Sequence, residues 1–199
     1  MSETSVGIIG LGNMGSAMAR TCQRAGLTVF ATDVTAAARA RAAASGITVV
    51  ETIAALVDQT QCIMLSLPSS REVSAVVEGP GGVLECAPSG TLIIDTTTAD
   101  PSETRRIAQL LRVAGHDMVD APLSGGPAGA EAGTLTIVIG GTADAQARAA
   151  QVLNAIGETL VPVGDVGAGH VAKLMNNLLV AAHLGLMREA IGAGVAAGL

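Results

Sequence analysis

The sequence is poor in aromatic residues and in positive charge. Of its 199 residues none is tryptophan or tyrosine, and Phe30 is the one phenylalanine. Proteins that bind single strands stack bases on aromatic side chains, and proteins that bind duplexes need a basic surface. The net charge of −6 at pH 7 would repel a phosphate backbone. Nucleic acid is therefore excluded as a partner.

Metal-ligating side chains are few and scattered. The three cysteines form no CxxC pair and stand among apolar neighbours, which is typical of buried thiols in a reducing compartment. The three histidines are also far apart. The cysteines are Cys22, Cys62 and Cys86, and the histidines are His116, His170 and His183. We therefore predict no metal site.

Signals for targeting are also lacking. The first apolar run follows Met1-Ser2-Glu3-Thr4 directly, with no basic segment before it, which predicts no signal peptide and a cytoplasmic location. The longest apolar stretch, residues 178–199, carries His183, Arg188 and Glu189, and charges near the middle of a membrane span are costly. We therefore expect a buried helix there and no membrane partner.

Short apolar runs rich in valine, isoleucine and leucine alternate with helical patterns along most of the chain. Such runs are continuous rather than alternating, which is typical of βα units whose parallel sheet is covered on both faces. The expected strands are residues 6–9, 28–32, 62–67, 91–95, 118–120, 135–139 and 160–163. This pattern predicts an α/β fold.

The helices are recognised by their ends. Over residues 100–115, Asp100 can cap a helix, Pro101 fits its first turn and Gly115 can close it. From about residue 168 the pattern becomes one long helical run with no strand after it. We therefore expect one domain over residues 1–165 and the first long helix of an all-α domain over residues 166–199.

A glycine-rich segment follows the first expected strand and opens a helix. Its spacing is GxGxxG, in which Gly10 permits a tight turn, Gly12 lets the backbone approach a pyrophosphate and Gly15 lets helix and strand pack closely. The loop consists of Gly10, Leu11, Gly12, Asn13, Met14 and Gly15. In this position the pattern predicts a dinucleotide-binding, Rossmann-type domain with a mostly parallel sheet and helices on both faces.

Asp33 ends the second expected strand, 18 residues after Gly15. An acidic residue about 20 residues after the glycines binds the ribose hydroxyls of NAD and repels the extra phosphate of NADP. The alternative is that Asp33 only caps the next helix. With the glycine loop present, we predict an NAD site.

Four further segments carry polar or flexible residues at expected strand ends or on one helix face. Leu67-Pro68 and the segment 95–98, which ends at Thr98, both follow strands, at the edge where ligands bind in open α/β sheets. Ser124-Gly125-Gly126 could present backbone amides to a carboxylate, although a plain turn is the alternative. Lys173 and Asn177, at i and i+4, share one helix face, although in most helices such a pair is a solvent-exposed lysine in a polar patch.

Taken in order, these motifs resemble those of the β-hydroxyacid dehydrogenase family, which includes 3-hydroxyisobutyrate dehydrogenase and tartronate semialdehyde reductase. The resemblance covers essentially the whole chain. It implies that Lys173 is the catalytic lysine and Asn177 its partner. The implied substrate-carboxylate residues are Ser124, Gly125 and Gly126, and the implied cofactor contacts are Leu67, Pro68 and Thr98.

The resemblance implies reversible transfer of a hydride between NAD and a small 3-hydroxycarboxylic acid, with Lys173 as general acid or base. Two alternatives remain open. One is an imine reductase-like NADP enzyme, against which Lys173 and Asp33 both count. The other is a non-catalytic nucleotide-binding module. Since family members continue into a helical domain, we expect a C-terminally incomplete chain whose apolar last helix favours a homo-oligomer, dimer or tetramer, or poor solubility.

Overall fold

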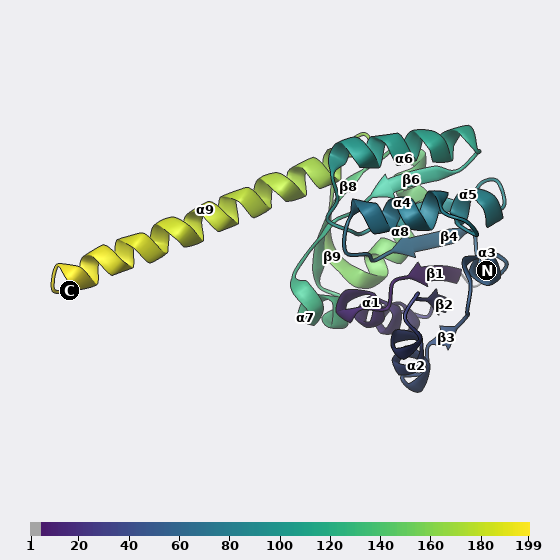
Figure 1. Cartoon of the computed structure of the whole chain (residues 1–199), viewed down its shortest axis with the longest axis horizontal. Coiled ribbons are helices and arrows are strands. Elements are labelled where there is room, and N and C mark those ends of the chain that lie inside the picture. The colour runs from purple at the N-terminus through teal and green to yellow at the C-terminus, as the bar shows by residue number, and fades with distance from the viewer. Residues whose placement is uncertain (1–4) are drawn as a thin grey trace.

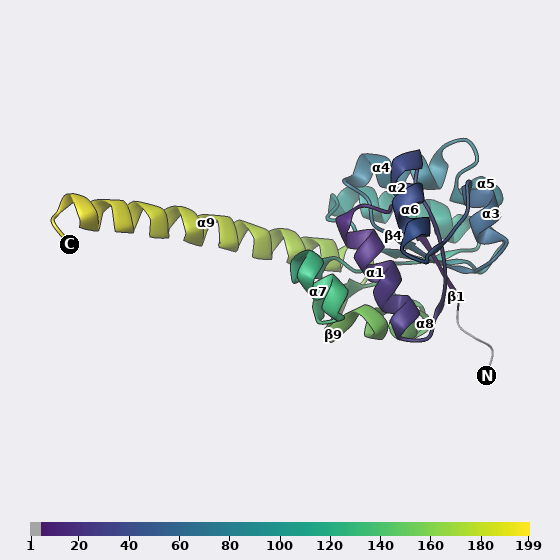
Figure 2. The same cartoon turned by 90° about the horizontal axis from the view of Figure 1, so that it is seen from below.

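The protein consists of an α/β body from which one long helix projects (Figures 1 and 2). The structure is a computed structural model, and it describes residues 5–199. Met1 to Thr4, on which the prediction of no signal peptide depends, lie outside the described residues. The projecting helix is α9 (Ala168–Ala196).

The body is built on a nine-stranded sheet in the order β3-β2-β1-β4-β5-β6-β8-β7, with β9 paired to β8. All pairs from β3 to β6 are parallel, β8 is antiparallel to both β6 and β7, and β9 is parallel to β8. The strands are β1 (Ser5–Ile9), β2 (Thr28–Thr32), β3 (Thr48–Val49), β4 (Cys62–Leu65), β5 (Leu92–Asp95), β6 (Asp117–Asp120), β7 (Leu123–Ser124), β8 (Leu135–Gly140) and β9 (Gly157–Gly164).

Helices cover both faces of this sheet, as predicted. Successive residues of a buried strand point to opposite faces, so Ile8 packs in one core with α1 and α8, and Ile9 packs in the other with α4 and α6. Besides α9, the helices are α1 (Asn13–Arg24), α2 (Ala36–Ala44), α3 (Ile53–Val57), α4 (Ser70–Glu78), α5 (Val83–Cys86), α6 (Pro101–Val113), α7 (Gly126–Ala132) and α8 (Ala143–Ile156).

The predicted α/β class and mostly parallel sheet are confirmed, and the differences lie at the edges. All seven expected strands form, but β4 ends at Leu65, two residues early. The two-residue strands β3 and β7 were not expected, because two residues are too few to show a period in the sequence. Most of β9 is exposed, so coverage of both sheet faces holds only for the inner strands.

The expectation of a buried C-terminal helix is wrong for this chain. Only Gly169 and His170 of α9 are buried, and apolar side chains such as Leu178 and Ile191 are more than half exposed. An apolar run indicates that a helix is buried against something, and the described residues do not supply that partner. By length and composition alone, α9 could cross a membrane, with a mean hydropathy of 1.4 in its most apolar window. The expectation of no membrane partner stays a prediction.

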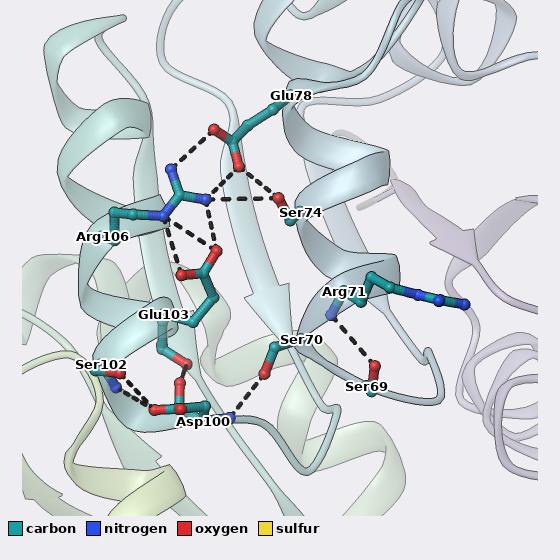
Figure 3. A network of polar contacts seen from close by, with 10 residues as sticks. Ser69, Ser70, Arg71, Ser74, Glu78, Asp100, Ser102, Glu103 and Arg106 are labelled. Atoms are coloured by element: carbon teal, nitrogen blue, oxygen red, sulfur yellow. Dashed lines mark hydrogen bonds and ion pairs between the residues drawn. The ribbon is translucent and has the colours of Figure 1, made fainter.

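A network of polar side chains joins α4 to α6 on one face of the sheet (Figure 3). Arg106 of α6 donates to Glu78 of α4 at 2.9 Å and to Glu103 at 2.6 Å. At the other end of the interface, the Asp100 N–H donates to Ser70 Oγ at 2.8 Å. These partly exposed ion pairs add little to stability, but they fix the position of α4 relative to α6.

The close packing of α1 on β1 yields a first prediction. A Cβ added at Gly15 would lie 1.9 Å from the Gly10 carbonyl oxygen, whereas a Cβ added at Gly12 has no described atom within 4 Å. We expect Gly15→Ala to lower the free energy of unfolding by about 1–3 kcal/mol, the usual cost of overpacking. Gly12→Ala, the matched control, should unfold like the wild type in urea. Equal midpoints for the two variants would contradict this packing.

Candidate active site

One cleft of about 950 Å³ gathers most of the residues singled out from the sequence. It lies along the carboxyl ends of the parallel strands and against the first turns of α9, so its wall comes from segments more than 160 residues apart. Thirteen of the fifteen predicted site residues line it. These are Gly10, Gly12, Asn13, Met14, Asp33, Leu67, Pro68, Thr98, Ser124, Gly125, Gly126, Lys173 and Asn177.

The glycine loop has the shape that binding of a pyrophosphate requires. Gly10 has a φ of +103°, which L side chains rarely adopt, and a Cβ there would lie 2.2 Å from the Ser66 carbonyl oxygen. The position of Gly12 opens into the cleft. No described side chain caps the N-terminus of α1, and its first turn holds no acidic residue. The first backbone N–H groups of α1 are therefore available to an anion.

Two residues of the predicted loop do not line the cleft. Gly15 instead allows the close packing of α1 on β1. Leu11 is also outside the cleft because its side chain is 1% exposed in the core. Its backbone N–H instead donates to Asp33 Oδ2 at 2.7 Å.

Asp33 is held so that its carboxylate faces the cleft. Besides the Leu11 N–H on Oδ2, Oδ1 accepts the Thr35 N–H at 2.7 Å. An ionised carboxylate has about four acceptor positions, so two remain for other donors. Asp33 thus closes the turn after β2 but does not cap α2, whose N-cap is Thr35, and it keeps the capacity to accept a ribose diol.

Lys173 and Ser124 meet at the other end of the cleft. The Lys173 ammonium group donates to Ser124 Oγ at 2.9 Å. Partial burial lowers the pKa of Lys173 from its usual 10.5, because desolvation disfavours the charged form. Asn177 lines the cleft one turn further along α9 and is exposed. Within the described chain no arginine or histidine lines the cleft, so Lys173 is its one cationic side chain.

Sequence reasoning missed one simple signal at Lys173. It is the only lysine in the 199-residue sequence, in which the ten other basic residues are arginines. Arginine stays charged under all ordinary conditions, whereas a lysine can lose its proton when buried. Lys173 is therefore the one basic side chain of the sequence, apart from the histidines, that burial could neutralise.

Other residues of the cleft carried no sequence pattern. Glu72 and Val76 reach it from α4, and Asn176 and Val180 reach it from α9. Their assignment depends on which face of each helix meets the sheet. His170, in the first turn of α9, is fully buried and does not line the cleft.

The fold and the cleft together define a dinucleotide-binding domain of the Rossmann type. The open position at Gly12, the uncapped start of α1 and the acceptor capacity of Asp33 fit the pyrophosphate and ribose of a nicotinamide dinucleotide. Residues 5–164 match a family model described as the NAD binding domain of 6-phosphogluconate dehydrogenase, and the chain belongs to this family.

Comparisons over the whole chain point to hydroxy acid dehydrogenases. The chain is 41% identical to 2-(hydroxymethyl)glutarate dehydrogenase from Eubacterium barkeri, over 98% of its own length and 64% of that protein. It is 36% identical to mitochondrial 3-hydroxyisobutyrate dehydrogenase from Mus musculus, over 100% of its own length and 59% of that protein.

A solved structure supports the same relationship. The 3-hydroxyisobutyrate dehydrogenase of Mycobacterium tuberculosis, described with L-serine, has a TM-score of 0.87 at 32% identity, over 94% of this chain and 64% of that chain. The chain therefore spans less than two thirds of the length of each of these three proteins.

The environment of Lys173 yields a second prediction. Reductive methylation with ¹³C-formaldehyde labels one side chain, because the sequence has one lysine, and the N-terminal amine is the only other target. We expect NMR titration to give methylated Lys173 a lower pKa in the folded protein than in urea, because burial destabilises its charge. A folded-state pKa at or above the value in urea would show that the amine is not desolvated.

Proposed function

We propose that the protein is an NAD-dependent oxidoreductase that interconverts a small 3-hydroxycarboxylic acid and its semialdehyde. The observation that carries the proposal is the single cleft, in which a dinucleotide loop and the Lys173–Ser124 pair face the same space. Similarity to 2-(hydroxymethyl)glutarate and 3-hydroxyisobutyrate dehydrogenases supports the reaction class.

Lys173 is the general acid or base of this mechanism. A nicotinamide dinucleotide held by the glycine loop and Asp33 would supply the hydride acceptor for oxidation of the alcohol carbon. The neutral amine of Lys173 takes the hydroxyl proton in the same direction, and the ammonium returns it during reduction. The lowered pKa of Lys173 favours this role, since it raises the fraction of neutral amine near neutral pH.

The loop at Ser124 is suited to hold the substrate carboxylate. Gly125 and Gly126 line the cleft beside Ser124, and their φ values are +128° and +62°. Because glycine has no side chain, the backbone itself borders the cleft at these two residues. Ser124 Oγ accepts from Lys173 and keeps its own proton to donate. We assign the carboxylate to Ser124, Gly125 and Gly126, and we assign to Asn177 the orientation of Lys173 or of the substrate hydroxyl.

The cofactor assignment follows from charge. Asp33 faces the part of the cleft beside the glycine loop, where a 2′-phosphate on the ribose would meet its carboxylate. Like charges at close range are unfavourable by several kcal/mol, so the site favours NAD over NADP. Leu67, Pro68 and Thr98 border the same space and are assigned to cofactor contact.

The activity is tested with NAD and a panel of 3-hydroxyisobutyrate, 2-(hydroxymethyl)glutarate, glycerate and L-serine, by following NADH formation. Lys173→Ala should lower kcat by about 10²–10⁴, the usual contribution of a general acid or base, with the Kd for NAD unchanged. Lys173→Arg is the matched control for charge, since a guanidinium keeps the positive charge but releases no proton. It should be as inactive as Lys173→Ala.

The outcomes separate the proposal from its alternatives. Full activity in Lys173→Arg would mean that the lysine acts only through its charge. NAD binding without turnover of any acid in the panel would favour a nucleotide-binding module. Turnover of cyclic imines with NADPH would favour the imine reductase alternative.

The preference for NAD is tested at Asp33. Asp33→Asn keeps the shape of the side chain and one acceptor oxygen but removes the charge, so the Kd for NADP relative to NAD should fall by about tenfold or more. Asp144→Asn, on the exposed first turn of α8, changes the net charge equally and should leave the ratio as it is. A ratio unaffected by Asp33→Asn would contradict the assignment.

A further inference from the structure

Asp120, the last residue of β6, is a fully buried carboxylate to which the mechanism assigns no role. Its Oδ1 accepts the Gly167 N–H at 2.6 Å, and its Oδ2 accepts the His170 N–H at 2.8 Å. Both amides belong to the start of α9. The N-cap residue of α9 is Gly167, which has no side chain with which to cap the helix, and the first turn holds no acidic residue. Asp120 therefore caps this helix from 47 residues away.

The backbone of α9 and of β8 approaches Asp120 closely. A Cβ added at Gly169 would lie 2.8 Å from the Asp120 carbonyl oxygen, and one added at Gly140 of β8 would lie 2.4 Å from Asp120 Oδ1. The first turn of α9 and the end of β8 thus both lie against the same aspartate. Its negative charge also opposes the positive end of the helix dipole.

The same short segment then contacts α9 a second time. Four residues after Asp120, Ser124 accepts the ammonium of Lys173 at 2.9 Å. Lys173 follows His170 by three residues, so it lies about one helical turn beyond the amide that Asp120 binds. The direction of the first turn therefore decides where the lysine side chain reaches.

We propose that Asp120 is a positioning residue for Lys173, because its two hydrogen bonds to the start of α9 place the ammonium group on Ser124 Oγ. The proposal rests on the proposed function for its catalytic consequence, but the position of the amine can be measured without turnover. Without the cap, α9 tilts from the sheet, the amine moves into water and proton transfer slows.

His170 adds a second attachment of the same turn. Its Nδ1 lies 2.8 Å from Thr104 Oγ1 on α6, and Thr104 Oγ1 also lies 2.9 Å from the Asp100 carbonyl oxygen. A carbonyl can only accept, so the hydroxyl donates to Asp100 and accepts from His170, which places a proton on Nδ1. His170 thereby binds the first turn of α9 to β6 through its backbone N–H and to α6 through its imidazole ring.

The test compares two pairs of variants of the full chain. Asp120→Asn keeps the volume but places amide protons against backbone N–H groups. Its control is Asp117→Asn on the same strand, where the carboxylate binds Arg148 at the surface. Gly169→Ala keeps the carboxylate but pushes the helix away from it. Its control is Gly185→Ala, on the same helix with no described atom within 4 Å of the added Cβ.

The readouts are the pKa of ¹³C-methylated Lys173 and the kinetic constants. We expect Asp120→Asn and Gly169→Ala to move the pKa of Lys173 back toward 10.5 and to lower kcat by about tenfold or more, with the KM for NAD unchanged. A loss of folding alone would lower the apparent kcat through the active fraction and leave KM unchanged, so kcat is expressed per folded protein, with the folded fraction taken from the cooperative unfolding transition in urea. Both controls should behave as wild type.

The proposal is overturned if folded Asp120→Asn keeps the wild-type pKa of Lys173 and the wild-type kcat. If Asp120→Asn does not fold, Gly169→Ala decides in the same way. If the wild type turns over no 3-hydroxy acid, the proposed function fails. The pKa of Lys173 in the two variants still shows whether Asp120 positions the amine.

Discussion

The bidentate contact between the Asp120 carboxylate and the first amides of α9 joins the long helix to the edge of the sheet. Two further hydrogen bonds hold the start of α9, from His170 to Thr104 and from Lys173 to Ser124. The carboxylate is fully buried, so its charge depends on the Gly167 and His170 N–H groups for compensation. The carboxylate and the two N–H groups satisfy one another, which makes this contact between β6 and α9 specific.

The cleft contains few charged side chains, and this sets the protonation of Lys173. Its wall is mostly apolar, with carboxylates at Asp33 and Glu72 and the one cation at Lys173. Glu72 is occupied by Ser69, whose hydroxyl donates to it at 2.5 Å, and by Arg71 at 3.1 Å. The hydrogen-bond partner of Lys173 is therefore the Ser124 hydroxyl and not, among the described residues, a carboxylate. Burial then lowers the pKa of Lys173. A carboxylate in that place would have kept the amine charged.

Much of this arrangement could be predicted from the sequence, because its signals are local. The runs that form β1, β2 and β5 are continuous and apolar, the glycine loop has a fixed spacing, and Asp33 follows at the expected distance. Each of these features lies within one βα unit. The parallel order of the inner strands and the common edge for their ligands follow from that connectivity.

The remainder depends on contacts between distant segments. The cap of α9 is supplied by Asp120, 47 residues before Gly167, and no periodicity links them. The side chain of Leu11, a predicted cofactor contact, fills the core, and its backbone N–H donates to Asp33, which no local pattern indicates. The exposure of α9 could not be predicted either, because an apolar sequence does not specify which partner covers it.

The most direct test of one continuous site is whether the nicotinamide end of the cofactor reaches Lys173. The ¹³C-methyl signal of Lys173 would be followed while NAD is added, with ADP-ribose as the control that occupies the glycine loop but lacks the nicotinamide. The account predicts that saturating NAD shifts the signal and changes the pKa of Lys173, and that bound ADP-ribose does so much less. Saturation by NAD with no change at Lys173 would show that the dinucleotide loop and the lysine do not share a site.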